Sequence, residues 1–358
     1  MVEIIFNLAE KIYIKLIYIN KDVVVYMRWI VKRLLMALLT IYVVITITFF
    51  LIRFMPGDFV EMMVYYYMTN YGMSEFEARE MVYGLYGVEL KDPLWLQYIK
   101  YMITLLHGSW GESYITHQPV LKSLLYGLPW TVFLLSISLT ISFIIGIGIG
   151  ILMAYRRGGI FDNIASVIAS ISRATPNFIL GLLLLYFFAI YYPIFPARSS
   201  YDISIKPGFT IEFISSVLYH SFLPMMAYVL TSFGGWALAM RGSAIRVLGE
   251  DYIVAAEARG LKSSRISRTY VGRNALLPLF TSFAISLGYM FGGSVFIETY
   301  FAYNGIGQII GLALSWRDYP LIQGGFLLIT SAVVISNFIA DLLYGLLDPR
   351  IRRGGMYE

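Results

Sequence analysis

The sequence of 358 residues contains no cysteine, only three histidines and few charged residues. The lack of cysteine excludes disulfides, thiolate metal sites and a cysteine nucleophile. Charged residues make up 14% of the chain, whereas soluble domains contain about 25%. Hydrophobic residues make up 58% and the mean hydropathy is +0.70, so we expect a membrane protein. The net charge of +5 does not indicate nucleic-acid binding, because the cations flank apolar runs.

Motifs for nucleotide binding and catalysis are also missing. No GxxxxGK[ST] loop occurs, so this chain cannot hold nucleotide phosphates in that way. No HExxH motif or nucleophile elbow occurs, which disfavours a membrane enzyme, and the three histidines are not spaced as a metal pair. The centres of the apolar runs lack the ionisable groups that ion-coupled carriers use. We therefore expect a pore body driven by a partner, with a stand-alone channel or ion-coupled carrier as the alternative.

Long apolar runs, each flanked by charged residues, predict an all-α polytopic membrane protein. Each run is long enough, at about 1.5 Å per residue, to cross a hydrocarbon core of roughly 30 Å. Six spans are expected, at Leu34–Ile52, Ser123–Tyr155, Ala174–Ala197, Phe213–Met240, Asn274–Ile297 and Tyr319–Ala340. The third helix is expected to start earlier and to bend around Arg173 and Pro176.

The predicted spans divide the chain into five segments. Residues 1–26 are either an amphipathic helix on the membrane surface or precede the true start at Met27. The other segments are a basic flank with the first span (27–53), an outer subdomain (54–122), a transmembrane core (123–349) and a tail (350–358).

Local patterns add detail to the parts outside the membrane. In the outer subdomain, Ser74–Tyr83 is expected to form a helix capped by Ser74 and Glu77, and Pro93–Leu106 a second helix. The segment Pro193–Ile211 contains three prolines and is expected to be irregular.

The charges of the loops predict the orientation of the protein in the membrane. Residues 241–273 carry seven lysines or arginines and three acids, whereas residues 54–122 carry four and eight. Because positively charged loops stay on the cytoplasmic side, we expect a multi-pass protein of the cytoplasmic membrane with both termini in the cytoplasm.

The stretch Arg241–Pro278 is a charged cluster between two apolar runs. Its centre, Glu250–Gly260, predicts a short helix that begins with two acids and ends with Arg259 and a left-handed Gly260. Three alanines inside it give a face with little side chain, which another backbone can approach closely. We interpret this helix, which contains Ala255, Ala256 and Ala258, as a docking element for a partner protein.

Small residues also gather inside the apolar runs. For Gly146, Gly148 and Gly150 we prefer close helix packing to a role in a pathway. Both interpretations stay open for the glycines on the spans beside the docking stretch, which are Gly234, Gly235, Gly288, Gly292 and Gly293. Glu298, at the outer end of the fifth span, is either an interfacial anchor or a residue beside a gate.

A series of motifs follows in a specific order along the chain. They are RFMPGD (53–58), DPLWLQY (92–98), HGSWGES (107–113), QPV (118–120), GLPWT (127–131), EDYIVAAEARGL (250–261), RNALLP (273–278), GGSVFIETYFAYNGIG (292–307), RDYPLIQG (317–324) and NFIADLLYGLLDPRIR (337–352). With this order and spacing, the chain from Met27 onward resembles the transmembrane permease subunits of dipeptide/oligopeptide-type ABC importers.

The resemblance implies a division of labour among several chains. A second homologous permease subunit completes the pathway, two ABC ATPase subunits bind ATP and Mg, and an extracytoplasmic solute-binding protein delivers the solute. This chain would be non-catalytic and would hold no cofactor itself. The implied solutes are di- or oligopeptides, with oligosaccharides or metal complexes as alternatives.

The resemblance also implies a role for the short helix, as the cytoplasmic EAA loop on which an ATPase subunit docks. The implied docking residues are Asp251, Tyr252, Ala255, Ala256, Glu257, Ala258, Arg259, Gly260 and Leu261. Ala255, Ala256 and Gly260 match the two alanines and the glycine of the general motif. Val254 stands where that motif has glutamate, so Glu257 does not inherit the role of the glutamate by its letter alone.

Overall fold

The computed structural model describes residues 2–55, 59–86, 92–262, 265–289 and 295–347. Within these residues the regular elements are helices, apart from one isolated bridge between Glu112 and Pro119. Helices satisfy their backbone hydrogen bonds internally, which apolar segments in lipid require. The predicted all-α fold class is confirmed.

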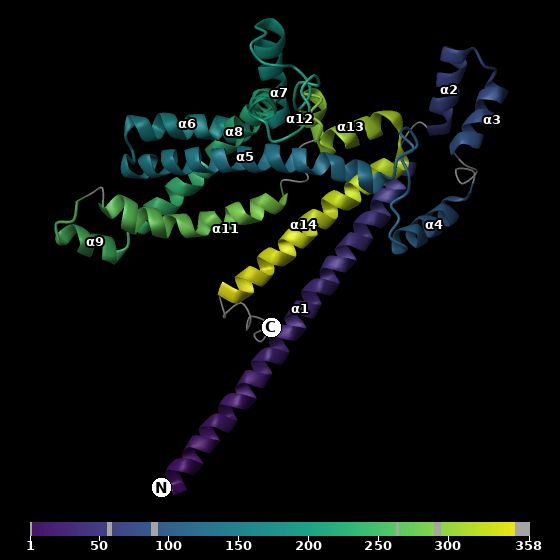
Figure 1. Cartoon of the computed structure of the whole chain (residues 1–358). Coiled ribbons are helices and arrows are strands. Elements are labelled where there is room, and N and C mark those ends of the chain that lie inside the picture. The colour runs from purple at the N-terminus through teal and green to yellow at the C-terminus, as the bar shows by residue number, and fades with distance from the viewer. Residues whose placement is uncertain (1, 56–58, 87–91, 263–264, 290–294, 348–358) are drawn as a thin grey trace.

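The first helix, α1 (Val2–Arg53), is a long rod that packs along α14 (Tyr319–Leu347) (Figure 1). Its part from Trp29 to Arg53 is long and apolar enough to cross a membrane and includes the predicted first span. The helix continues without a break from Val2, so residues 2–26 extend the same rod and do not turn aside as a separate interfacial helix.

Two long helices, α5 (Val120–Tyr155) and α8 (Ile211–Leu248), pack along one another at the centre of the fold. A Cβ atom on Gly150 would lie 2.5 Å from the carbonyl oxygen of Ala237, and one on Gly146 would lie 2.4 Å from Cβ of Trp236. Glycine is therefore needed for the close approach of the two helices. Close packing, the preferred interpretation of this glycine patch, is confirmed for Gly146 and Gly150.

The third predicted span is a bent pair of helices. Helix α6 (Ile160–Ala174) meets α7 (Asn177–Leu185) at an angle of 93°, and a π-helical segment (η2, Tyr186–Tyr191) continues α7. Pro176 lacks an N–H and disfavours helical geometry at the residue before it, so the helix breaks there. The expected bend and the earlier start of the helix are confirmed, and the helix ends at Tyr191 instead of at Ala197.

Among the residues that the structure describes, four helices, α1, α5, α8 and α14, are long and apolar enough to cross a membrane, and the bent pair would make five. The predicted fifth span is described in part: α11 (Arg273–Tyr289) is followed by α12 (Val295–Tyr300), and residues 290–294 lie outside the described chain. The total of six spans therefore stays a prediction.

Short helices cover both ends of the molecule (Figure 1). Beyond α1 lie α2 (Phe59–Tyr71), α3 (Glu75–Tyr86) and α4 (Leu94–Leu106); α13 (Ile306–Trp316) lies between α12 and α14, and α9 (Asp251–Ala258) and η3 (Ile266–Gly272) lie between α8 and α11. The predicted helices at 74–83 and 93–106 are confirmed, and the segment 193–210 is irregular as expected. Helices α2 and α13 were not predicted.

The predicted cap at Ser74 forms as a reciprocal pair of hydrogen bonds. The backbone N–H of Ser74 donates to Oε2 of Glu77 over 2.9 Å, and the N–H of Glu77 donates to Oγ of Ser74 over 3.4 Å. The Ser74 hydroxyl also donates to Oε2, and these bonds lower the pKa of Glu77.

Buried apolar clusters fix the two ends of the molecule separately. One cluster joins the outer helices to α13 and α14 through residues such as Phe59, Val82, Ile310 and Ile322. Another joins the α9 region to α5, α8 and α11, and its buried members are Phe143, Ala154, Met240, Ala244, Ile253, Ala256, Ile266, Val271, Ala275 and Leu279.

Candidate functional site

The predicted docking helix is present as α9, one short helix between α8 and α11 (Figure 1). Glu250 is the N-cap residue, Asp251 lies in the first turn and Arg259 is the C-cap residue. Gly260 follows with a φ of +72°, a left-handed conformation that glycine adopts without strain. The N–H of Gly260 donates to the carbonyl oxygen of Glu257 over 2.8 Å, so the stop is hydrogen-bonded as well as shaped by glycine.

Helix α9 has one buried face and one exposed face. Ile253 and Ala256 are buried against α8, η3 and α11, with exposed fractions of 1% and 4%. The three alanines therefore do not share one free face, because Ala256 already packs against this chain. The exposed face carries small or medium side chains and two charges, on Tyr252, Val254, Ala255, Glu257, Ala258 and Arg259.

Polar contacts hold α9 and its flanks to the long helices. The Asn274 amide donates to the hydroxyl of Tyr252 over 3.0 Å, which joins the start of α9 to α11. The Ser243 hydroxyl donates to the carbonyl oxygen of Ala275 over 2.9 Å, which joins α8 to α11 where the loop leaves. One hydrogen bond thus ties α9 to α11, and another ties α11 to α8.

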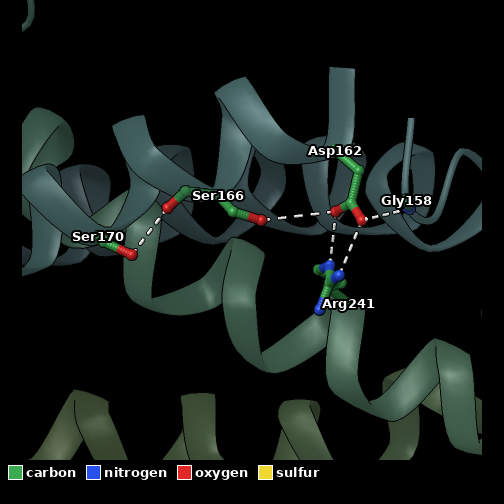
Figure 2. A network of polar contacts seen from close by, with 5 residues as sticks. All are labelled: Gly158, Asp162, Ser166, Ser170 and Arg241. Atoms are coloured by element: carbon green, nitrogen blue, oxygen red, sulfur yellow. Dashed lines mark hydrogen bonds and ion pairs between the residues drawn. The ribbon is translucent and has the colours of Figure 1, made fainter. Parts of the chain in front are cut away.

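A buried ion pair lies where α8 enters the docking stretch (Figure 2). Arg241 donates from Nε to Oδ1 of Asp162 over 2.6 Å and from Nη2 to Oδ2 over 2.8 Å. The N–H of Gly158 and the hydroxyl of Ser166 also donate to this carboxylate, which is 1% exposed, whereas the Arg241 side chain is 30% exposed. The bidentate pair locks the beginning of α6 to the end of α8.

Sequence reasoning missed this ion pair. It counted Arg241 only as a cytoplasmic charge and did not single out Asp162. The available signal was a lone carboxylate in the otherwise apolar segment IFDNIASVIASIS, since a buried charge needs a partner. The two residues are 79 positions apart, so nothing in the sequence favoured Arg241 over the other cations.

The structure separates the glycines that were candidates for packing or a pathway. A Cβ atom on Gly234 would lie 2.1 Å from the carbonyl oxygen of Ala169, so Gly234 allows α6 to pack on α8. Gly235 has open space at the same position, and its pathway role stays a prediction. Gly288 lies in α11, whereas Gly292 and Gly293 fall outside the described residues.

Glu298 is fully buried within the chain. Its Oε1 accepts a hydrogen bond from the Thr131 hydroxyl over 2.9 Å, and its Oε2 accepts one from the N–H of Gly307 over 2.6 Å. The N–H of Ile306 in turn donates to Thr131 Oγ1 over 2.9 Å. This group, the Glu298 junction, fastens α12 and the start of α13 to α5.

Within the described chain, no three or more His, Cys, Asp or Glu residues gather as a possible metal site. The main features of this region are an exposed short helix, which is fixed to two long helices, and a buried ion pair beside it. The exposed face of α9 therefore lies on a base that is held by contacts within the chain.

Comparison with known proteins finds a family match and extended relatives. The family described as "Binding-protein-dependent transport system inner membrane component" matches residues 146–353. A di/tripeptide transport system permease protein of Pseudomonas aeruginosa is 32% identical over 338 residues, which cover 90% of this chain and 98% of the relative. The dipeptide transport system permease protein of Escherichia coli K12 is 30% identical, covering 91% and 99%.

Two further matches extend this comparison. The oligopeptide transport system permease protein of Bacillus subtilis is 30% identical, covering 90% of this chain and 98% of the relative. A solved structure of the MetNI methionine ABC transporter, in inward facing conformations, is 19% identical with a TM-score of 0.45, covering 65% of this chain and 96% of that chain.

Proposed function

Because the chain belongs to the family of inner membrane components of binding-protein-dependent transport systems, we propose that it forms half of a peptide translocation pathway. In this proposal the solutes are di- or oligopeptides, as the names of the relatives suggest. ATP and Mg are bound by two separate ATPase subunits, one of which docks on α9. A second homologous permease subunit and an external solute-binding protein complete the importer.

The exposed face of α9, held on a fixed base, is the observation that carries the proposal. The side chains of Ala255 and Ala258 are small, so a cleft of another protein can close around the exposed face of the helix. The contact of Tyr252 with Asn274 would carry a displacement of α9 into α11, and the contact of Ser243 with Ala275 would pass it from α11 to α8. ATP would shift the conformation of the pore only if docking is stronger in one conformation than in the other.

The proposal includes an orientation. Helix α9 and both termini lie in the cytoplasm, in agreement with the excess of cations over acids in the docking stretch. Helices α2, α3 and α4 then face the external side, where the solute-binding protein arrives.

An uptake assay tests the role of α9. The double substitution Arg259→Glu with Gly260→Pro reverses the charge at the C-cap and removes the left-handed stop, because proline cannot adopt a positive φ. We expect ATP-driven peptide uptake to fall to background while the amount of protein in the membrane stays unchanged. The matched control Arg157→Glu reverses an exposed charge in the turn after α5 and should retain uptake. Normal uptake by the double variant would refute the docking role.

Competition experiments test the solute class separately. Unlabelled dipeptides and oligopeptides should inhibit uptake through the assembled importer, whereas oligosaccharides and metal complexes should not. Inhibition by a sugar or a metal complex alone would retain the permease role and replace the substrate. Transport by this chain alone in liposomes, without ATPase subunits, would favour the channel or carrier alternative.

A further inference from the structure

Helix α6 runs antiparallel to α8 along its length. At the first turn of α6, Asp162 pairs with Arg241. At its last turn, the Ser172 hydroxyl donates to the carbonyl oxygen of Leu230 over 2.6 Å. The two contacts are ten residues apart on α6 and eleven on α8, so the helices advance together. Depth along α6 can therefore be counted on α8, which is long and apolar enough to cross a membrane.

Arg173, at the end of α6, lies about half-way across the hydrocarbon core. It follows Asp162 by eleven residues, which correspond to about 16 Å of helix and to half of a core of roughly 30 Å. The core begins near the Asp162–Arg241 pair, because α8 carries no lysine, arginine or acid between Glu212 and Arg241, and Ile160 on α6 is already 80% exposed. An arginine near the end of a span can extend its charge to the interface, but one at this depth cannot.

The charge of Arg173 has no partner in the part of the chain that the structure describes. Its side chain is exposed and makes no hydrogen bond or ion pair with a described residue. Ionisable side chains inside a membrane face a water-filled cavity or pair with one another, because an unpaired charge in lipid is costly. The side of α6 that carries Arg173 therefore does not face lipid.

The exposed surface of α6 has a polar side and an apolar side. Residues at intervals of three and four stack along the polar side, which carries Asn163, the half-buried Ser166, Ser170 and Arg173. Figure 2 shows two of these serines following Asp162 along the helix. The exposed side chains of the apolar side are Ile160, Ile164, Val167, Ile168 and Ile171. The apolar side suits lipid, and the polar side suits an aqueous pathway.

We propose that the polar side of α6 lines the translocation pathway and that Arg173 binds the terminal carboxylate of a peptide at the middle of the membrane. A guanidinium donates two parallel hydrogen bonds to a carboxylate, and such charge-assisted bonds are the strong ones. Peptides with a free C-terminus share this carboxylate, whatever their side chains. The inference rests on the proposed function, because it takes a peptide as the solute.

Thiol labelling tests the aqueous surroundings of Arg173, because the chain has no natural cysteine. In the assembled importer, Arg173→Cys and Ser170→Cys should react with a charged methanethiosulfonate about tenfold faster than Ile171→Cys, since apolar surroundings suppress the reactive thiolate. Ile171 is the matched control, because it is 62% exposed and lies next to Ser170 in the sequence, but on the apolar side. Equal rates at the three positions would overturn the assignment of the polar side to the pathway.

Uptake of two matched peptides tests the carboxylate. The probes are trialanine and trialanine amide, which differ only in the terminal carboxylate, and the solute-binding protein is the same for every variant. Arg173→Gln should lower trialanine uptake about tenfold, since charge-assisted hydrogen bonds are lost, and should leave uptake of the amide unchanged. Arg173→Lys keeps the charge and should restore part of the preference. Arg157→Gln, at an exposed position in the turn after α5, should change neither rate.

The other outcomes separate this inference from the proposed function. Equal loss of both peptides in Arg173→Gln would overturn the carboxylate site and leave the permease role in place. Dissociation of the second permease subunit from that variant would reassign Arg173 to an ion pair between subunits. If the wild-type importer takes up neither peptide, the proposed function is refuted and the carboxylate site with it.

Discussion

At the α9 end of the molecule, a short helix exposes Ala255 and Ala258, whereas at the Glu298 junction a carboxylate is completely buried. The sequence pattern is similar in both places, because polar or small residues lie beside apolar runs. In the structure, the two places differ in how much of them is exposed. At the α9 end, one face of the helix is exposed. At the Glu298 junction, the described hydrogen bonds of the carboxylate fix α12 and α13 to α5.

Asp162 and Arg241 lie close to the α9 end but resemble the Glu298 junction in burial. They show that a charged side chain near α9 can be enclosed by the chain, since the Asp162 side chain is 1% exposed. The predictions below separate buried contacts, which should affect stability, from exposed ones, which should affect uptake.

The largest loss of stability is expected for Glu298→Ala. The substitution leaves the Gly307 N–H and the Thr131 hydroxyl without their acceptor in a buried place, each at a cost of about 1–3 kcal/mol. We expect the free energy of unfolding to fall by about 4 kcal/mol, measured by denaturation in detergent. Glu80→Ala, at an exposed position of α3, serves as the control and should unfold like the wild type.

The ion pair should respond asymmetrically to removal of its two partners. Arg241→Gln leaves the Asp162 carboxylate buried and without its cation, which should cost about 3 kcal/mol. Asp162→Asn leaves an arginine that still reaches solvent, so the loss should be about 1 kcal/mol. Equal losses for the two variants in the same denaturation assay would show that burial does not govern this pair.

The two faces of α9 should separate stability from uptake. Ala256→Phe overfills the buried cluster and should lower the free energy of unfolding by about 2 kcal/mol. Ala255→Phe adds the same ring to the exposed face, so we expect unchanged unfolding and at least tenfold slower ATP-driven uptake. If Ala255→Phe transports normally, the exposed face is not the docking surface.

The smallest effect is expected at Ser243. Ser243→Ala removes one neutral hydrogen bond to the carbonyl oxygen of Ala275, which should cost about 1 kcal/mol. Uptake should fall by less than the change at Ala255 produces, because the apolar cluster still joins α8 to α11. A loss of uptake as complete as that at Ala255 would make this hydrogen bond the main link between the docking end and the long helices.

Features set by neighbouring residues could be predicted from the sequence. Flanking charged residues located the four long helices. Pro176 marked the bend of the third predicted span, and Gly260 marked the left-handed end of α9. Each depends on steric or solvation rules that act within a few residues.

Features set by distant partners could not be predicted. The partner of Glu298 lies 167 residues away on Thr131, so the sequence left an interfacial anchor and a gate equally open. Ala256 has the same letter as Ala255, and only the packing of α8, η3 and α11 decides which of them is exposed. Helix α13 was missed because its eleven residues are too short to be recognised as a span between two predicted ones.

Site-specific cross-linking tests the docking of α9 most directly, because the chain contains no natural cysteine. Ala258→Cys, labelled with a thiol-reactive photo-cross-linker in the assembled importer, should capture an ATPase subunit and stop uptake after illumination. Ser74→Cys, exposed in the outer subdomain, should capture no ATPase subunit. Capture of the ATPase from Ser74→Cys and not from Ala258→Cys would contradict both the docking role of α9 and the proposed orientation.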